Sequence, residues 1–85
     1  MLEVFWTAQA KNDYDYWAKQ RPKIAKRINN LISSISKDPF RGLGKPEPLK
    51  HDLQGFWSRR ISRGHRLVYE VSDGVIMIYS CSDHY

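Results

Sequence analysis

Branched apolar residues at helical spacing constrain the fold of this chain more than any other feature. They recur at intervals of three and four between Pro22 and Asp38, which gives a helix one continuous apolar side. Pro22 suits the first turn of such a helix, and Asp38-Pro39 ends it. We therefore predict a helix that begins at Pro22 and buries this side. The apolar side consists of Ile24, Ile28, Leu31, Ile32 and Ile35.

The residues before this helix predict a short strand and another helix. Leu2–Trp6 is a short apolar segment, and Thr7 suits the N-cap of a helix over residues 8–20. Tyr14 and Trp17 are three residues apart, so we expect them on one side of that helix, packed in the core or against a partner.

The second half of the chain predicts antiparallel strands. Arg63-Gly64 and Asp73-Gly74 are typical of tight hairpin turns, and strands joined by such turns must be antiparallel. Residues 39–48 hold three prolines and two glycines, which predicts a stiff loop. The predicted strands are Phe56–Ser62, His65–Ser72 and Val75–Ser82, with Leu49–Asp52 as a candidate for a further short one.

Helices followed by strands indicate an α+β fold over a single domain of residues 1–85. We expect two helices packed on one face of a twisted, mainly antiparallel sheet, with the opposite face open for function. The lone Cys81 cannot form an internal disulfide, which indicates a reducing compartment such as the cytoplasm. We expect no signal peptide, no membrane helix and no structural zinc site, because the patterns that each requires are missing from the sequence.

The net charge of +5 is concentrated in one stretch of the chain. Residues 41–66 hold seven basic residues against two acidic ones, whereas basic and acidic residues balance in the rest. A positive field focused in this way suits a polyanion, and nucleic acid is the commonest one. A solvated basic face that only aids solubility is the alternative interpretation.

Residues in and near this basic stretch have the chemistry to cleave RNA without a metal. The 2′-hydroxyl of RNA attacks the adjacent phosphorus, which requires a general base, cations for the charged phosphorane and an acid for the leaving 5′-oxygen. Lys45 and Lys50 favour the ionised form of Glu47 as the base, and a histidine can supply the proton. DNA lacks the 2′-hydroxyl, so the set predicts RNA chemistry. The candidates are Glu47, Lys50, Arg59, Arg60, Arg66, His84 and Tyr85.

Each candidate also has a structural interpretation. A glutamate between two prolines, such as Glu47, is commonly a solvated loop residue. Arg59 and Arg60 are also typical of charges that protect the edge of a sheet, and terminal residues such as His84 and Tyr85 are often frayed. From composition and spacing alone, a nucleic-acid binding module and a ribonuclease therefore both stay open.

A long motif resembles a known family. The stretch GKPEPLKHDLQGFWSRRISRGHRLVYEV at residues 44–71, followed by the terminal Asp83-His84-Tyr85, closely resembles the YoeB (Txe/YoeB) toxins of bacterial type II toxin–antitoxin systems. The similarity includes Asp13-Tyr14 and Trp17 near the start of the chain. This family lies within the RelE-like superfamily, so the resemblance implies a RelE-like fold similar to that of microbial ribonucleases.

The resemblance also implies an activity and partners. It implies a metal-independent endoribonuclease, an mRNA interferase that cleaves messenger RNA in the ribosomal A site and inhibits translation in the bacterial cytoplasm. It further implies a homodimer, neutralised by a cognate YefM-like antitoxin. Operator DNA would be bound only by the toxin–antitoxin complex, which represses its own transcription.

The resemblance assigns roles to individual residues. The resemblance implies that Glu47 matches the position of the family's general base and His84 that of its general acid. Arg66 matches the position of the residue that stabilises the transition-state phosphate. Lys50 and Arg60 are similar to phosphate-binding residues, and Tyr85 to a residue that orients the substrate. Two further basic residues, Lys45 and Arg59, are expected to bind phosphate beside them.

Two alternatives from other classes remain. One is a non-catalytic module that binds RNA or the ribosome, in which Glu47 and His84 are spectators. The other is an antitoxin-dependent co-repressor, in which the basic stretch contacts operator DNA. A gap sized for one phosphate between Glu47 and His84 would favour the enzyme, and a helix-turn-helix or ribbon element would favour the co-repressor.

Overall fold

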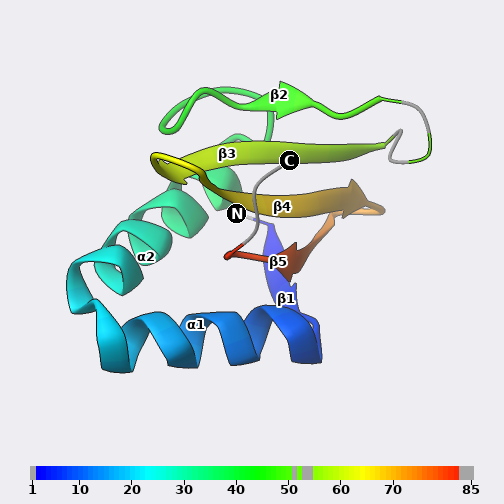
Figure 1. Cartoon of the computed structure of the whole chain (residues 1–85). Helices are drawn as coiled ribbons and strands as arrows, with labels where there is room; N and C mark the ends of the chain where they lie inside the picture. The colour runs from blue at the N-terminus through cyan, green and yellow to red at the C-terminus, as the bar shows by residue number, and fades with distance from the viewer. Residues whose placement is uncertain (1, 51, 53–54, 83–85) are drawn as a thin grey trace.

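The computed structural model describes residues 2–50, 52 and 55–82 of the chain. Its five strands form one sheet in the order β1-β5-β4-β3-β2, and Figure 1 shows the two helices on one side of this sheet. The elements are β1 (Glu3–Trp6), α1 (Ala8–Gln20), α2 (Pro22–Lys37), β2 (Glu47–Pro48), β3 (Phe56–Ser62), β4 (His65–Ser72) and β5 (Val75–Ser80). The predicted α+β fold is confirmed.

The ends of both helices follow from local sequence. The hydroxyl of Thr7 accepts a hydrogen bond from the backbone N–H of Ala10 at 3.1 Å, which caps the first turn of α1. Pro22 lies in the first turn of α2, where the amide that proline lacks would have no helical partner. Asp38 has extended backbone and ends α2. The predicted bounds of the two helices are therefore confirmed.

The apolar side of α2 fills the space between the helices and the sheet. Ile28, Leu31 and Ile35 are fully buried, as are Leu67 and Tyr69 of β4. Burying a Leu or Ile side chain contributes about 1.5–3 kcal/mol to stability, so these side chains stabilise the contact between α2 and the sheet. None of the helices in the described part of the chain is long and apolar enough to cross a membrane.

The sheet is mainly antiparallel, as predicted, because only β1 and β5 pair in parallel and the other neighbours are antiparallel. Two details differ from the sequence prediction. The short second strand is Glu47–Pro48, not Leu49–Asp52, and it lies at the edge of the sheet, where a proline without an amide donor is tolerated. β5 ends at Ser80 instead of Ser82, because the N–H of Cys81 donates to Asp13 of α1.

Candidate functional site

The face of the sheet that points away from the helices carries the candidate site. Glu47 in β2 is paired with Ser58 in β3, and Arg60 in β3 is paired with Arg66 in β4. Residues paired across neighbouring strands share a face, and residues two apart on one strand share it too. Three strands therefore bring Glu47, Ser58, Arg60 and Arg66 to one surface, although 19 residues separate Glu47 from Arg66 along the chain.

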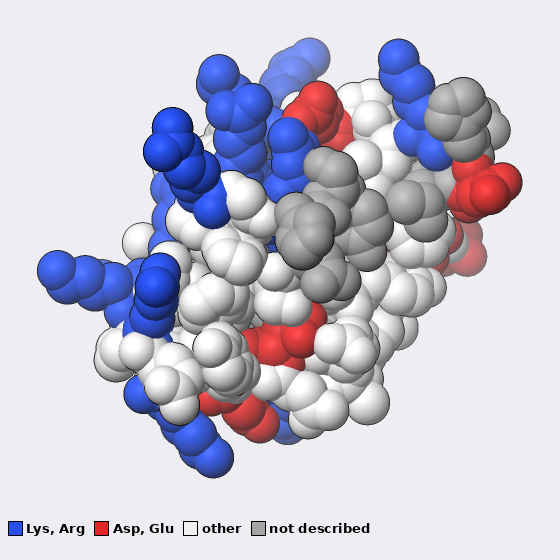
Figure 2. All heavy atoms as spheres, in the orientation of Figure 1, with Lys and Arg blue, Asp and Glu red and all other residues white. Residues whose placement is uncertain are grey.

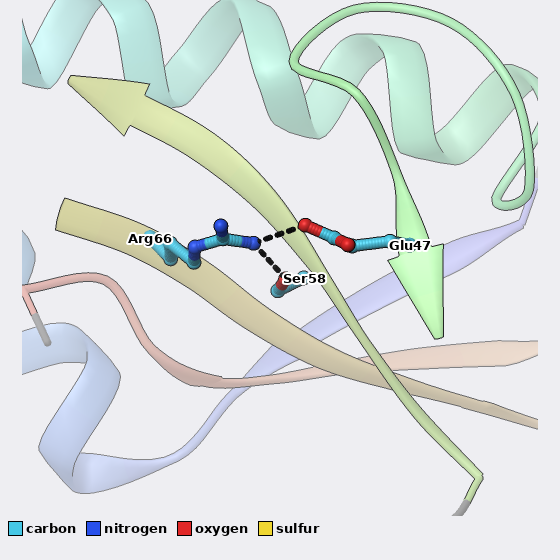
Figure 3. A network of polar contacts seen from close by, with 3 residues as sticks. All are labelled: Glu47, Ser58 and Arg66. Atoms are coloured by element: carbon cyan, nitrogen blue, oxygen red, sulfur yellow. Dashed lines mark hydrogen bonds and ion pairs between the residues drawn. The ribbon is translucent and has the colours of Figure 1, made fainter. Parts of the chain in front are cut away.

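Arg66 links the two other polar groups at the centre of this surface. Its Nη1 donates to Glu47 Oε1 at 2.5 Å and to Ser58 Oγ at 3.0 Å (Figure 3). The side chain of Arg66 is 23% exposed and that of Glu47 is 51% exposed, so solvent or a ligand can reach both. Ser58 is not among the site residues that the sequence predicts, although strand alternation places it on the same face as Arg60.

The ion pair controls the protonation state of Glu47. The hydrogen bond from Arg66 and its positive charge lower the pKa of the Glu47 carboxyl, and the charges of Arg60 and Lys45 lower it further. Glu47 is therefore ionised at neutral pH and stays so below the usual range of a glutamate. A carboxylate in this state can accept a proton, as a general base must.

Positive charge surrounds the pair. Lys45, Lys50 and Arg60 are all exposed. Figure 2 shows Lys and Arg side chains gathered over the side of the molecule where Figure 1 places β2, β3 and α2. Arg60 and Lys45 lie near enough to Glu47 to lower its pKa, so the open face around the ion pair carries positive charge. Within the described ranges, no group of three or more His, Cys, Asp or Glu side chains is placed to hold a metal ion.

The expectation that Arg59 binds phosphate is wrong. Its side chain is fully buried on the helix side of the sheet, opposite to Arg60. Nε donates to the Tyr69 hydroxyl at 3.1 Å, and the four other donor positions are used within 3.0 Å. These four go to Ser34 Oγ and to the backbone carbonyls of Asp38, Arg41 and Leu43. Arg59 therefore holds the loop before β2 and neither binds a ligand nor protects a sheet edge.

Alternation along β3 explains why two adjacent arginines have different roles. Neighbouring residues of a strand point to opposite faces, so one arginine must enter the core when the other faces solvent. The partners of Arg59 are mainly backbone carbonyls of a distant loop. Such partners leave no residue-type signal in the sequence, so the burial of Arg59 could not be predicted from it.

Two predicted site residues, His84 and Tyr85, lie outside the described residues. Their roles therefore stay predictions. The structure brings together Glu47, Arg66 and Arg60, with Lys45 near enough to lower the pKa of Glu47.

Comparison with known proteins gives consistent matches over the chain. Residues 6–85 match the family model of the YoeB-like toxin of bacterial type II toxin-antitoxin systems. The toxin YoeB of Escherichia coli strain K12 is 49% identical over 84 residues, which cover 99% of this chain and 100% of that protein.

Two solved structures from Staphylococcus aureus have the same fold. The structure of a YoeB dimer has a TM-score of 0.91 and 46% identity, and the match covers 99% of this chain and 98% of that chain. A YoeB–YefM complex has a TM-score of 0.89 and 45% identity, and the match covers 100% and 99% of the two chains.

Proposed function

This chain belongs to the YoeB-like toxins of bacterial type II toxin–antitoxin systems, and we propose that it is a metal-independent endoribonuclease that cleaves messenger RNA in the ribosomal A site. The observation that carries the proposal is the contact between Arg66 and Glu47 on the open face of the sheet. It joins a carboxylate and a cation at one point, inside the most basic stretch of the chain.

Glu47 acts as the general base that removes the proton of the 2′-hydroxyl. In the free protein the hydrogen bond from Arg66 lowers the pKa of Glu47, which makes it a weaker base. A phosphate bound at Arg66 competes for the same guanidinium, which weakens the ion pair and raises the pKa of Glu47. Substrate binding thus makes Glu47 a better base at the moment when a base is needed.

Arg66 stabilises the phosphorane, because its charge acts where negative charge develops during the reaction. The bond to Ser58 keeps the guanidinium in place when Glu47 releases it. Arg60, Lys45 and Lys50 bind the neighbouring phosphates. Arg59 has no part in this binding, because it is buried.

His84 acts as the general acid that protonates the leaving 5′-oxygen, and Tyr85 orients the substrate. These two roles rest on the family's motif and on the ordinary pKa range of histidine, which allows proton donation near neutral pH.

Single-turnover cleavage of a messenger on programmed ribosomes tests this function. Glu47→Gln keeps the size and polarity of the side chain but removes the base, so we expect the rate to fall by about 10²–10⁴-fold. Glu3→Gln is the matched control, because Glu3 is an exposed glutamate of β1 and lies at the other edge of the sheet. A Glu47→Gln protein that cleaves at the full rate would contradict the assignment.

The same assay separates the enzyme from a binding module. A module that only occupies the ribosome would inhibit translation and leave the messenger intact. It would also be unaffected by Glu47→Gln. The co-repressor alternative requires that the basic stretch bind operator DNA, which a gel-shift assay of the toxin with and without antitoxin measures.

We further propose that the protein works in the bacterial cytoplasm, associates with the ribosome, and forms a homodimer that a YefM-like antitoxin neutralises. The solved relatives include a YoeB dimer and a YoeB–YefM complex. The positive charge of residues 41–66 suits an acidic antitoxin segment. An antitoxin that binds only the folded toxin raises its melting temperature in proportion to the logarithm of antitoxin concentration. The complex, and not the toxin alone, binds operator DNA.

A further inference from the structure

Helix α1 and the start of β4 hold the chain where it leaves β5. The N–H of Cys81 donates to Asp13 Oδ2 at 3.0 Å, and the Trp17 indole N–H donates to the Cys81 carbonyl at 2.8 Å. Both backbone groups of Cys81 are thus bonded to α1 side chains. The Cys81 thiol also donates to the carbonyl of Ala10 at 3.4 Å.

A side chain of β4 holds the next residue, Ser82, in place. His65 Nδ1 lies 2.6 Å from the Ser82 carbonyl oxygen, and because a carbonyl only accepts, Nδ1 carries the proton. The His65 ring packs edge to face against Trp17, with ring centroids 4.9 Å apart. Trp17 therefore bonds Cys81 directly and packs against His65, which holds Ser82.

Ordinary packing does not require these polar groups. Asp13 is 7% exposed and Trp17 is 5% exposed, and the carboxylate of Asp13 also accepts a bond from Gln9 at 2.8 Å. Burying a carboxylate is costly unless it is hydrogen-bonded, and an apolar pair would fill the same space without that cost. The gain from these residues is a fixed position for the backbone at Cys81 and Ser82.

The position of His65 connects this anchor to the candidate site. His65 precedes Arg66 in β4, but its ring packs on the helix side of the sheet, whereas Arg66 faces the open side. β5 runs antiparallel to β4 with Ser80 paired to Val68, so the chain that leaves β5 runs along the start of β4, where Arg66 lies. His84 comes two residues after Ser82, and two residues span at most about 7 Å. An anchor at Ser82 therefore fixes the backbone two residues before His84, beside the start of β4.

We propose that Asp13, Trp17 and His65 are positioning residues, which fix the chain at Cys81 and Ser82 and thereby place His84 for proton transfer to the leaving oxygen. This proposal rests on the proposed function, in which His84 is the general acid. It predicts that breaking the anchor lowers the rate of the chemical step more than it lowers ribosome affinity.

The test compares two substitutions of His65. His65→Phe keeps a ring against Trp17 but has no donor for Ser82, whereas the side-chain amide of His65→Asn keeps an N–H near the position of Nδ1. A displacement of about 1 Å at a catalytic group can cost about 10²-fold. We therefore expect a roughly 10- to 100-fold lower single-turnover rate for His65→Phe, with ribosome affinity unchanged, and a rate near that of the unsubstituted protein for His65→Asn.

A double substitution distinguishes positioning from a general structural effect. If His65 acts through His84, His65→Phe should lower the rate less than about twofold when His84→Gln is already present, because coupled residues are non-additive. Ser36→Ala is the matched control. Its hydroxyl donates to the Leu2 carbonyl at 2.9 Å, which is also a side-chain bond to the backbone but lies between α2 and the start of the chain.

The outcomes separate the two proposals. A normal rate in His65→Phe, or an equal loss with and without His84→Gln, overturns the positioning role while the proposed function stands. A full rate in His84→Gln removes His84 from the mechanism and overturns both. If His65→Phe does not fold, Trp17→Phe removes the donor to Cys81 instead, and the same comparison with His84→Gln applies.

Discussion

Replacing Arg59 with methionine should destabilise the protein strongly, because Arg59 holds the loop before β2. Methionine fills part of the same volume without donors, so one substitution removes five hydrogen bonds. Hydrogen bonds to charged groups are worth about 1.5–3 kcal/mol each, but the loop carbonyls can bind water once they are released, and the cation's desolvation cost is recovered. We therefore expect a net loss of about 3–5 kcal/mol, because each buried acceptor that stays without a partner costs about 1–3 kcal/mol.

That loss is a large share of the stability of a small domain, which is typically about 5–15 kcal/mol. For a domain of this size, each kcal/mol shifts the melting temperature by about 4–8 °C, so we expect Arg59→Met to melt roughly 12–40 °C lower. Thermal unfolding followed by circular dichroism measures this shift directly.

Arg60→Met is the matched control, because Arg60 is the next residue and its side chain is exposed. Its stability should change by no more than about 0.5 kcal/mol. Its affinity for RNA should fall, and the slope of log affinity against log salt should become shallower by about 0.7 for each lost phosphate contact. An Arg59→Met protein with unchanged melting temperature and a shallower salt slope would refute the buried role of Arg59.

Three further predictions concern single residues. The carboxyl of Glu47 should titrate at a higher pH in Arg66→Ala than in the unsubstituted protein, as followed by NMR, because Arg66 lowers its pKa; equal midpoints would contradict the ion pair. In the unsubstituted protein, the stability that this pair contributes is complete above the usual pKa of a glutamate and is lost as pH falls through the lowered value. Burial raises the pKa of the Cys81 thiol to about 12, so iodoacetamide at pH near 8 should alkylate it only after unfolding, and rapid alkylation of the folded protein would show that it is accessible. Gly44→Ala should lower the melting temperature more than Gly64→Ala, because both have φ near +84° but only at Gly44 would a Cβ come within 2.7 Å of a leucine of α2; equal shifts would show that backbone strain alone decides.

Local patterns explain the parts of the fold that the sequence predicted. The helix from Pro22 has its apolar stripe, first-turn proline and terminating Asp38 within one segment, and all three signals agree. The strands Phe56–Ser62 and His65–Ser72 are joined by a turn whose residues specify a hairpin. Such features need no knowledge of distant residues.

Features that depend on distant contacts were not predictable. The parallel pairing of β1 with β5 joins the two ends of the chain, and the fold of everything between them decides it. The burial of Arg59 depends on a loop that ends at β2, and the bond from His65 to Ser82 depends on how β4 and the end of β5 meet α1. In the candidate site, the chemistry of Glu47 and Arg66 was predictable from residue types, whereas their contact was not.

The most direct test of the proposed chemistry is cleavage of a messenger that carries one 2′-deoxy nucleotide immediately before the cut. The mechanism requires the 2′-hydroxyl as nucleophile, so the substituted messenger should stay intact on the ribosome. The all-ribose messenger should give a 5′-hydroxyl on one product and a 2′,3′-cyclic phosphate or 3′-phosphate on the other. Efficient cleavage of the 2′-deoxy messenger at the same position would contradict the roles proposed for Glu47 and Arg66.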